Sequence, residues 1–275
     1  MKKILMIATG GTIASKEGGD GLTPAMTGEE LASNVPGIES KCDLTVLQLM
    51  NIDSTNMRPR QWLMISETIL EHYDHYDGFV ILHGTDTMAY TAAALSYLIQ
   101  DSRKPIVLTG SQKPMGDPYT DAKLNIYQSI LYALDDKSCR VSIVFNGKAV
   151  IGTRARKQRT RSFDAFESMN FPPLAIIHDD RIIRHYTGVI PAPSDLKTYH
   201  QLNDRVFVLK LTPEVKADIF YLLKDHYDAI ILETFGIGGI PEYDDSFQNA
   251  IFDWVDSGKT LAVTTQVPEE GCDLQ

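Results

Sequence analysis

The chain has 275 residues, of which 43% are hydrophobic and 23% are charged, and its formal net charge at pH 7 is -10. This length allows one large domain or two modest domains, each with a buried core of its own. The negative charge argues against a nucleic-acid partner, because phosphate binding requires a surplus of Lys and Arg. It also argues against binding to an anionic membrane surface.

The three cysteines, Cys42, Cys139 and Cys272, lie far apart and follow no metal-ligand or redox spacing. Such an odd, scattered set is typical of a reducing compartment. The apolar run after Lys2 and Lys3 is too short for a signal peptide, and no run approaches the length of a membrane span. We therefore expect a cytoplasmic protein.

Short apolar runs alternate with helical patterns through most of the chain, which is typical of a parallel sheet flanked by helices. In the first part of the chain, strands are expected at residues 3–9, 44–49, 79–83, 106–109 and 141–145. Each run is apolar on both faces, which predicts central strands covered by helices on each side.

The helices between these strands have recognisable start signals. Thr27 and Glu30 form a capping-box pattern, and Pro59 suits the first turn of the following helix. The run at residues 87–99 is rich in Ala and apolar at helical spacing.

The pattern weakens between Pro172 and Leu202, where prolines and short polar turns predict a β-rich tail followed by a linker. The predicted fold class is α/β, with a large N-terminal domain (1–185) whose sheet is mainly parallel and flanked by helices. A linker (186–203) leads to a smaller C-terminal α/β domain (204–275).

The smaller domain has the same alternation of strands and helices. Its strands are expected at residues 206–211, 229–233 and 261–265. One helix is expected to open at Thr212 and Pro213, and another near residues 247–255.

Ligands of open α/β sheets bind beyond the carboxyl ends of the strands. Four strand ends in this chain offer glycines, hydroxyls and carboxylates: Thr9-Gly10-Gly11-Thr12, Asn51-Ile52-Asp53-Ser54-Thr55, His83-Gly84-Thr85-Asp86-Thr87 and Thr109-Gly110-Ser111. Glycines let the backbone approach a ligand, hydroxyls can act as nucleophiles, and carboxylates can hold an amine. Thr87 and Ser111 are expected to cap helices instead. Together the four ends predict a polar ligand pocket.

Other chemistries lack their motifs. The chain has no Walker-type loop and no Gly-x-Ser-x-Gly elbow, and its nearest dinucleotide fingerprint, beginning at Gly236, has Pro241 in place of the third glycine. His83 is the only histidine at these strand ends, and a lone histidine is more often structural than a metal ligand. We therefore expect neither a metal nor a cofactor. A threonine nucleophile would then need another base, and the stretch at residues 154–159 offers Lys157, although spacing alone does not separate it from its neighbours.

Two long blocks, Thr9-Gly10-Gly11-Thr12-Ile13-Ala14 and His83-Gly84-Thr85-Asp86-Thr87-Met88-Ala89-Tyr90-Thr91, closely resemble the signatures of the bacterial-type asparaginase family. Shorter similarities beginning at Thr109, Gly152 and Phe163 extend the resemblance over nearly the whole chain. The resemblance implies a cytoplasmic L-asparaginase that works without a cofactor, through an acyl-enzyme. It also implies a homodimer or homotetramer, with each active site between the large domain of one subunit and the small domain of a neighbour.

The resemblance also suggests roles for individual residues. Thr12 resembles the attacking threonine of the family. Thr85, Asp86 and Lys157 resemble a second group, in which the lysine supports the threonine and the aspartate holds the α-amine of the substrate. These four residues are the predicted catalytic groups.

Free asparagine carries two charges, and both need partners in a dry site. Asp86 is expected to hold the α-amine, and Ser54 resembles the residue that fixes the α-carboxylate. The predicted substrate-binding residues are Gly11, Asp53, Ser54, Thr55, Gly84, Thr85 and Asp86.

Three features depart from the family pattern. The lid segment at residues 16–23 has no tyrosine, and Leu22 stands where the family often has one. Gly239 stands where members commonly have an asparagine that reaches the neighbouring site. The family usually continues beyond the position of Gln275, which predicts an incomplete smaller domain. Two alternatives therefore stay open: a catalytically impaired homologue that binds an amino acid or a partner, and the amidase subunit of a tRNA-dependent amidotransferase.

Overall fold

The computed structural model describes residues 1–18, 21–24, 26–185, 188–242 and 245–272. For residues 15–18 and 21–24 it describes the backbone alone. The chain divides into two compact units, Met1–Gln201 and Leu202–Gln275. Within the described ranges, none of the helices combines the length and apolar character that a membrane crossing requires.

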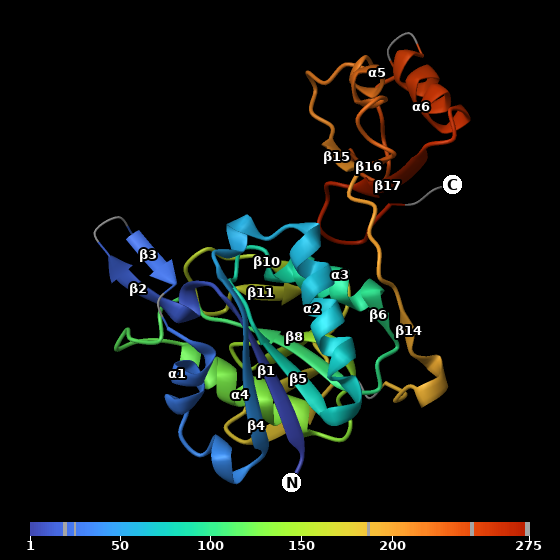
Figure 1. Ribbon diagram of the computed structural model, residues 1–275. Coiled ribbons are helices and arrows are strands. Elements are labelled where there is room, and N and C mark those ends of the chain that lie inside the picture. The colour runs from blue at the N-terminus through green and yellow to red at the C-terminus, as the bar shows by residue number, and fades with distance from the viewer. Residues whose placement is uncertain (19–20, 25, 186–187, 243–244, 273–275) are drawn as a thin grey trace. The chain divides into compact units, whose positions relative to one another are not determined.

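An eight-stranded sheet forms the centre of the first unit (Figure 1), in the order β13-β12-β9-β8-β7-β5-β1-β4. Five strands run parallel: β1 (Lys3–Gly10), β4 (Asp43–Ile52), β5 (Gly78–Leu82), β7 (Pro105–Thr109) and β8 (Arg140–Phe145). Three antiparallel strands extend the sheet at one side: β9 (Lys148–Ile151), β12 (Ala175–His178) and β13 (Arg181–Arg184). The mainly parallel sheet predicted for the large domain is confirmed.

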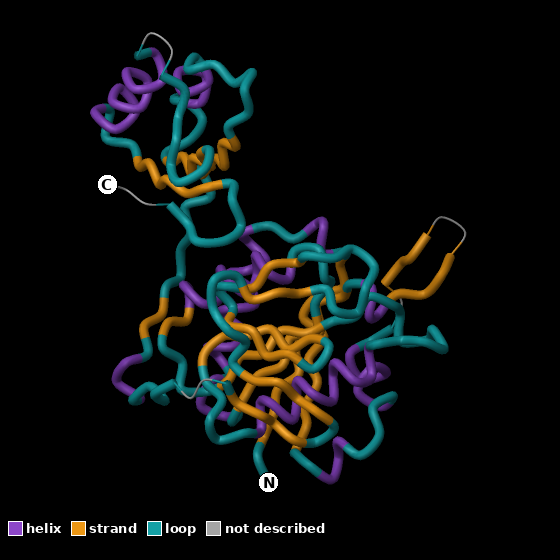
Figure 2. Tube along the Cα trace, turned by 180° about the vertical axis from the view of Figure 1, so that it is seen from behind, coloured by secondary structure: helices purple, strands orange, loops and turns teal. Residues whose placement is uncertain are grey.

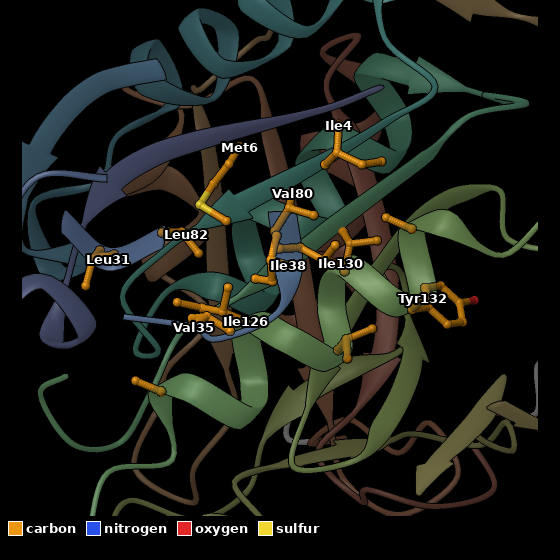
Figure 3. Packing of buried hydrophobic residues seen from close by; sticks show 14 of the residues in the cluster. Ile4, Met6, Leu31, Val35, Ile38, Val80, Leu82, Ile126, Ile130 and Tyr132 are labelled. Carbon is orange, nitrogen blue, oxygen red and sulfur yellow. The ribbon is translucent and has the colours of Figure 1, made fainter. Parts of the chain in front are cut away.

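Helices cover both faces of this sheet. On one face α1 (Gly28–Ser33) and α4 (Ala122–Leu134) pack on the side chains shown in Figure 3, among them Ile4, Met6 and Val80. On the other face α2 (Pro59–Glu71) and α3 (Met88–Leu98) pack on a second core that includes Leu5 and Ile7. Consecutive residues of β1 therefore alternate between the two cores, so the strand is buried on both sides.

The local helix signals are confirmed. The Thr27 hydroxyl accepts the N–H of Glu30 at 3.2 Å, while the Glu30 carboxylate accepts the N–H of Thr27 at 2.8 Å. Pro59 occupies the first turn of α2. The central position predicted for residues 44–49 is wrong, because β4 lies at the sheet edge beside β1. Its polar residues Thr45 and Gln48 are exposed, as an edge strand allows.

Short elements complete the first unit. They are the hairpin of β2 (Ser15–Gly18) and β3 (Gly21–Pro24), the pair β10 (Ala155–Lys157) and β11 (Phe166–Ser168), the pair β6 (Ile99–Gln100) and β14 (Lys197–Thr198), and the 3₁₀ turns η1 (Thr12–Ala14), η2 (Ile38–Ser40), η3 (Ser54–Asn56), η4 (Tyr73–His75) and η5 (Pro193–Asp195). Figures 1 and 2 show the β2–β3 hairpin projecting from this unit, at the predicted lid. Residues 19 and 20 and the side chain of Leu22 lie outside the described part.

The predicted linker is partly structured. It contains η5 and β14, and β14 pairs with β6 of the first unit. Residues 186 and 187 of this segment lie outside the described part.

The second unit has three parallel strands, β15 (Val206–Lys210), β16 (Ala229–Thr234) and β17 (Thr260–Thr265), in that order. Its helices α5 (Ile219–Leu223) and α6 (Ser246–Asp256) share a core that includes Phe220, Phe247 and Trp254. The α/β character predicted for this part is confirmed.

The helix predicted to open at Thr212 and Pro213 begins instead at Ile219. The N–H of Val215 donates to the carbonyl of Thr212, which closes a turn in place of the first helical turn. Gln275 lies outside the described residues, so the predicted incompleteness of this domain stays a prediction.

Candidate active site

The carboxyl ends of β1, β4 and β5 approach one another through glycines. Gly10 and Gly11 have φ angles of +103° and +86°, which favour glycine. A Cβ on Gly11 would lie 2.4 Å from the Cα of Gly84, and a Cβ on Gly84 would lie 2.6 Å from the Cβ and Oγ of Ser54. Because neighbouring atoms occupy the space of a side chain, only glycine allows these segments to come so close.

Thr12 directly follows this contact and begins η1. The N–H of Gly11 donates to the carbonyl of Ile52 at 3.0 Å, which ties this loop to the end of β4. Thr12 is half-buried, and its hydroxyl has no hydrogen-bond partner among the described residues. The hydroxyl is therefore free to meet a ligand.

Lys157 joins the site from β10. Its ammonium group donates to Thr85 Oγ1 at 2.8 Å and to Asp86 Oδ1 at 2.6 Å. The Lys157 side chain is 17% exposed, whereas that of Asp86 is 59% exposed. A hydroxyl, an amine and a carboxylate are thus linked by hydrogen bonds, with the carboxylate on the open side.

The rest of the basic stretch points to other partners or to solvent. Arg159 forms an ion pair with Asp164 at 3.2 Å and with Glu167 at 2.8 Å, and Arg156 is exposed. The tertiary structure therefore selects Lys157 among residues that spacing alone does not separate.

Gln112 extends the hydrogen-bonded chain beyond Thr85. Its Nε2 donates to the carbonyl of Ser162 at 3.0 Å, and because a carbonyl can only accept, the Oε1 atom is turned toward Thr85. The Thr85 hydroxyl donates its hydrogen to this Oε1 at 3.3 Å. The oxygen of Thr85 consequently presents its lone pairs to Lys157, which donates to it.

The backbone around Gln112 is held by Asp121. The Asp121 carboxylate accepts the N–H of Gln112 at 3.0 and 3.1 Å and the N–H of Lys113 at 3.1 Å. It also accepts the side-chain amide of Asn125 at 3.0 Å. Burial raises the pKa of Asp121, and these hydrogen bonds oppose that effect.

His83 is fully buried directly before Gly84. Its Nδ1 donates to the Gly84 carbonyl at 2.7 Å, so its Nε2 accepts from the Thr91 hydroxyl at 2.9 Å, and that hydroxyl accepts from Trp62 Nε1 at 2.9 Å. Burial lowers the pKa of His83 to about 4, although the bond to Gly84 opposes this. The hydrogen-bonded structural role expected for His83 is confirmed. Among the described residues, no group of three or more His, Cys, Asp or Glu side chains could hold a metal ion.

Asp53 and Thr55 bond to each other at the start of η3. The Asp53 Oδ1 atom accepts the N–H of Thr55 at 2.8 Å and its hydroxyl at 2.7 Å. Ser54 between them is 4% exposed and contacts the Gly84 backbone. Of the predicted binding residues, the structure therefore packs Gly11, Ser54 and Gly84 together, while Asp53 and Thr55 stabilise their own turn.

The helix-capping role expected for two hydroxyls is wrong. Thr87 stands at the N-cap of α3, but its hydroxyl donates to the Ser54 carbonyl at 2.7 Å and caps no helical N–H. The Ser111 hydroxyl donates to the carbonyl of Lys113. The Thr87 hydroxyl therefore connects the loops that follow β5 and β4, whereas the Ser111 hydroxyl stabilises its own loop.

Two family models match the chain. The asparaginase N-terminal model matches residues 3–189, and the glutaminase/asparaginase C-terminal domain model matches residues 205–275. The chain belongs to the asparaginase family. The resemblance of the two sequence blocks is thereby confirmed, and the family is one of amidohydrolases.

The relatives of this chain include L-asparaginases and amidotransferase subunits. The L-asparaginase of Thermococcus kodakarensis is 32% identical over 274 residues, which cover 99% of this chain and 82% of that protein. Its solved structure aligns with a TM-score of 0.91 at 31% identity, covering 98% of this chain and 82% of that one. L-asparaginase 1 of Escherichia coli K12 is 35% identical over 257 residues, which cover 88% of this chain and 73% of that protein.

A glutamyl-tRNA(Gln) amidotransferase subunit of Metallosphaera sedula is also 35% identical, over 278 residues that cover 96% of this chain and 62% of that protein. An L-asparaginase and an amidotransferase subunit thus share the same sequence identity, 35%, with this chain. Family membership alone does not choose its substrate.

Gln112 and Asp121 are residues of this asparaginase-family site that the sequence patterns do not assign. Gln112 directly follows one of the four polar strand ends, and this position was the available signal. Asp121 lies 9 residues further on, in a loop, and no sequence pattern marks it. Its contribution depends on how that loop folds back.

Proposed function

We propose that this chain hydrolyses the side-chain amide of L-asparagine to L-aspartate and ammonia, with Thr12 as the nucleophile. The observation that carries the proposal is the Lys157 ammonium bonded to both Thr85, at 2.8 Å, and Asp86, at 2.6 Å. Amide hydrolysis needs a nucleophile and a group that moves a proton to the leaving nitrogen. Thr12 offers the first, and the Lys157–Thr85 pair offers the second.

In the proposed reaction, the Thr12 hydroxyl attacks the amide carbon and forms a tetrahedral intermediate. The C–N bond breaks as the proton lost by Thr12 reaches the nitrogen, so that ammonia leaves and an acyl-threonine ester remains. Water then attacks the ester, which releases aspartate and restores the hydroxyl. Thr85 and Lys157 relay the protons, and backbone N–H groups at the strand ends would stabilise the oxyanion.

Substrate binding uses the residues around this chain of hydrogen bonds. Asp86 is exposed enough to accept the α-ammonium group while it stays bonded to Lys157. Ser54 would fix the α-carboxylate, and Gly11 and Gly84 let the segments that carry Thr12, Ser54 and Thr85 approach one another closely. The turn formed by residues 53–55 holds Ser54 in place.

The family resemblance further supports a homodimer or homotetramer whose site is completed by the small domain of a neighbouring subunit. The cysteines Cys42, Cys139 and Cys272 are unpaired, which supports a reducing cytoplasm. The net charge of -10 supports a small-molecule substrate over a nucleic acid or a membrane.

The test is ammonia release from asparagine and from glutamine, measured for the parent chain and for Thr12→Ala and Thr85→Ala. We expect the parent to turn over asparagine in preference to glutamine, and each variant to lose about 10³-fold or more. No turnover by folded parent protein would contradict the proposal. It would support instead a catalytically impaired homologue that binds an amino acid or a partner.

The 35% identity to an amidotransferase subunit supports a second candidate, the amidase subunit of a tRNA-dependent amidotransferase. Glutamine hydrolysis that appears only when a partner protein and tRNA are added would favour this candidate. The acidic charge of the chain favours asparagine hydrolysis, because tRNA needs a basic surface.

A further inference from the structure

A small cavity lies at the amino end of β8, the end opposite to the one that faces the candidate active site. Its volume is about 50 Å³, and its lining includes Tyr132, Lys137, Cys139, Arg140 and Arg184. One water needs roughly 10–15 Å³ of such space, so the cavity holds about three to five water-sized groups. It suits a small ion rather than a metabolite.

Three cationic side chains line this cavity. It contains Lys137, Arg140 and Arg184, and among the described residues it contains no carboxylate. Arg140 is paired with Asp101 at 2.9 Å and Arg184 with Asp135 at 3.2 Å, but these two aspartates line neighbouring hollows instead. Of the three cations, only Lys137 has no carboxylate partner among the described residues, so the cavity wall keeps one unpaired positive charge.

Arg184 has one donor that no protein group satisfies. Its side chain is 10% exposed, its NH2 group donates to Ser138 Oγ at 2.8 Å, and its guanidinium carbon lies 5.1 Å from the centre of the Tyr132 ring. The Nε–H group is buried and has no acceptor in the described part of the chain. A buried donor on a charged group is costly to leave unpaired, so an acceptor from solution is favoured there.

We infer that this cavity binds a small oxyanion of the size and charge of inorganic phosphate. Phosphate carries between one and two negative charges at neutral pH, and its four oxygens are acceptors or hydroxyls. One oxygen accepts the Arg184 Nε–H, while Lys137, which has no carboxylate partner among the described residues, balances the charge. A water molecule would satisfy the Nε–H but carries no charge to balance Lys137, and a carboxylate carries one charge and fewer acceptor oxygens. Bound phosphate also covers Cys139, which forms part of the wall.

The first test compares phosphate, acetate and chloride on the full chain at equal ionic strength. Phosphate at about 10 mM should raise the melting temperature by about 2–4 °C in a saturable way, while acetate gives less than half of this and chloride gives none. Alkylation of Cys139, followed by peptide mass spectrometry, should slow at least about fivefold in phosphate, and that of Cys272 should not change. Equal effects of phosphate and chloride would overturn the inference.

Charge-matched variants locate the site. Lys137 is exposed, and its ammonium group has no partner among the described residues, so Lys137→Met should fold normally and bind phosphate about fivefold more weakly. Lys123→Met removes the same charge from the exposed face of α4 and should leave the phosphate effects unchanged.

Arg184→Lys keeps the charge but lacks the Nε–H, and phosphate should bind it at least about tenfold more weakly than the parent. If Arg184→Lys fails to fold, the comparison of Lys137→Met with Lys123→Met decides. Phosphate effects retained in full by Lys137→Met, or lost equally in Lys123→Met, would contradict the site.

Discussion

The two ends of the large sheet hold their polar groups in different ways. At the carboxyl ends of β1, β4 and β5, Gly11 and Gly84 bring backbone segments into contact, and the side chains beyond them form a continuous chain of hydrogen bonds. At the amino end of β8, long cationic side chains surround a cavity, and Arg184 keeps an unpaired donor. The proposed chemistry at the first end therefore depends on backbone approach, whereas the proposed binding at the second depends on charge and on an unpaired donor.

The largest expected effect tests the hydrogen-bonded chain at the carboxyl ends. Lys157→Met removes the group that links Thr85 to Asp86, and the rate of ammonia release should fall about 10³-fold. Arg156→Met is the matched control. The Arg156 side chain precedes Lys157 and is exposed, so this variant should keep the parental rate. Similar rates for the two variants would remove Lys157 from the proposed mechanism.

The backbone contact itself is tested by Gly11→Ala. The new Cβ would lie 2.4 Å from Gly84 Cα at a φ of +86°, so we expect a loss of about 3 kcal/mol in the free energy of unfolding, together with loss of activity. Gly116→Ala meets no atom within 4 Å and should change stability by less than about 0.5 kcal/mol. Urea unfolding measures both, and equal midpoints would show that the close approach is not required.

The buried histidine behind the site predicts a pH dependence. Burial holds the pKa of His83 at about 4, against an ordinary value of 6.5, so the unfolded chain takes up the proton first as the pH falls. The corresponding stability is fully present above pH 6.5 and is lost as the pH falls toward 4, which amounts to about 3 kcal/mol. Urea unfolding at several pH values should show a flatter dependence in His83→Gln than in the parent. The exposed-residue control His178→Gln should keep the parental slope, and an unchanged slope in His83→Gln would contradict this role.

The smallest effect concerns the orientation of Thr85. Gln112→Met removes the acceptor of the Thr85 hydroxyl, and kcat should fall about tenfold while KM stays within about twofold, because Gln112 positions a reacting group without holding the substrate. Gln158→Met, at an exposed position in the same loop region, should change neither constant. A rise in KM at constant kcat would assign Gln112 to substrate binding instead.

Local patterns in the sequence determine much of the fold and of the site. The capping box of Thr27 and Glu30 and the helix start at Pro59 are confirmed, because both depend on residues within one helical turn. The parallel sheet follows from apolar runs, and the four polar strand ends follow from the rule that parallel strands end at one edge. Two of these strand ends lie in the sequence blocks that resemble the asparaginase family, and the family models confirm that resemblance.

Contacts between distant segments decide what the sequence leaves open. Lys157 is selected from its basic neighbours by an oxygen of Thr85, 72 residues earlier in the chain. The hydroxyl of Thr87 donates to the carbonyl of Ser54 because the folded sheet brings the ends of β5 and β4 together. The order of strands in the sheet likewise leaves β4 at the edge. The amide of Gln112 and the unpaired Nε–H of Arg184 depend in the same way on which atoms surround them. Spacing along a chain records which groups are available, whereas hydrogen-bond direction and charge balance are set only when the folded backbone brings those groups together.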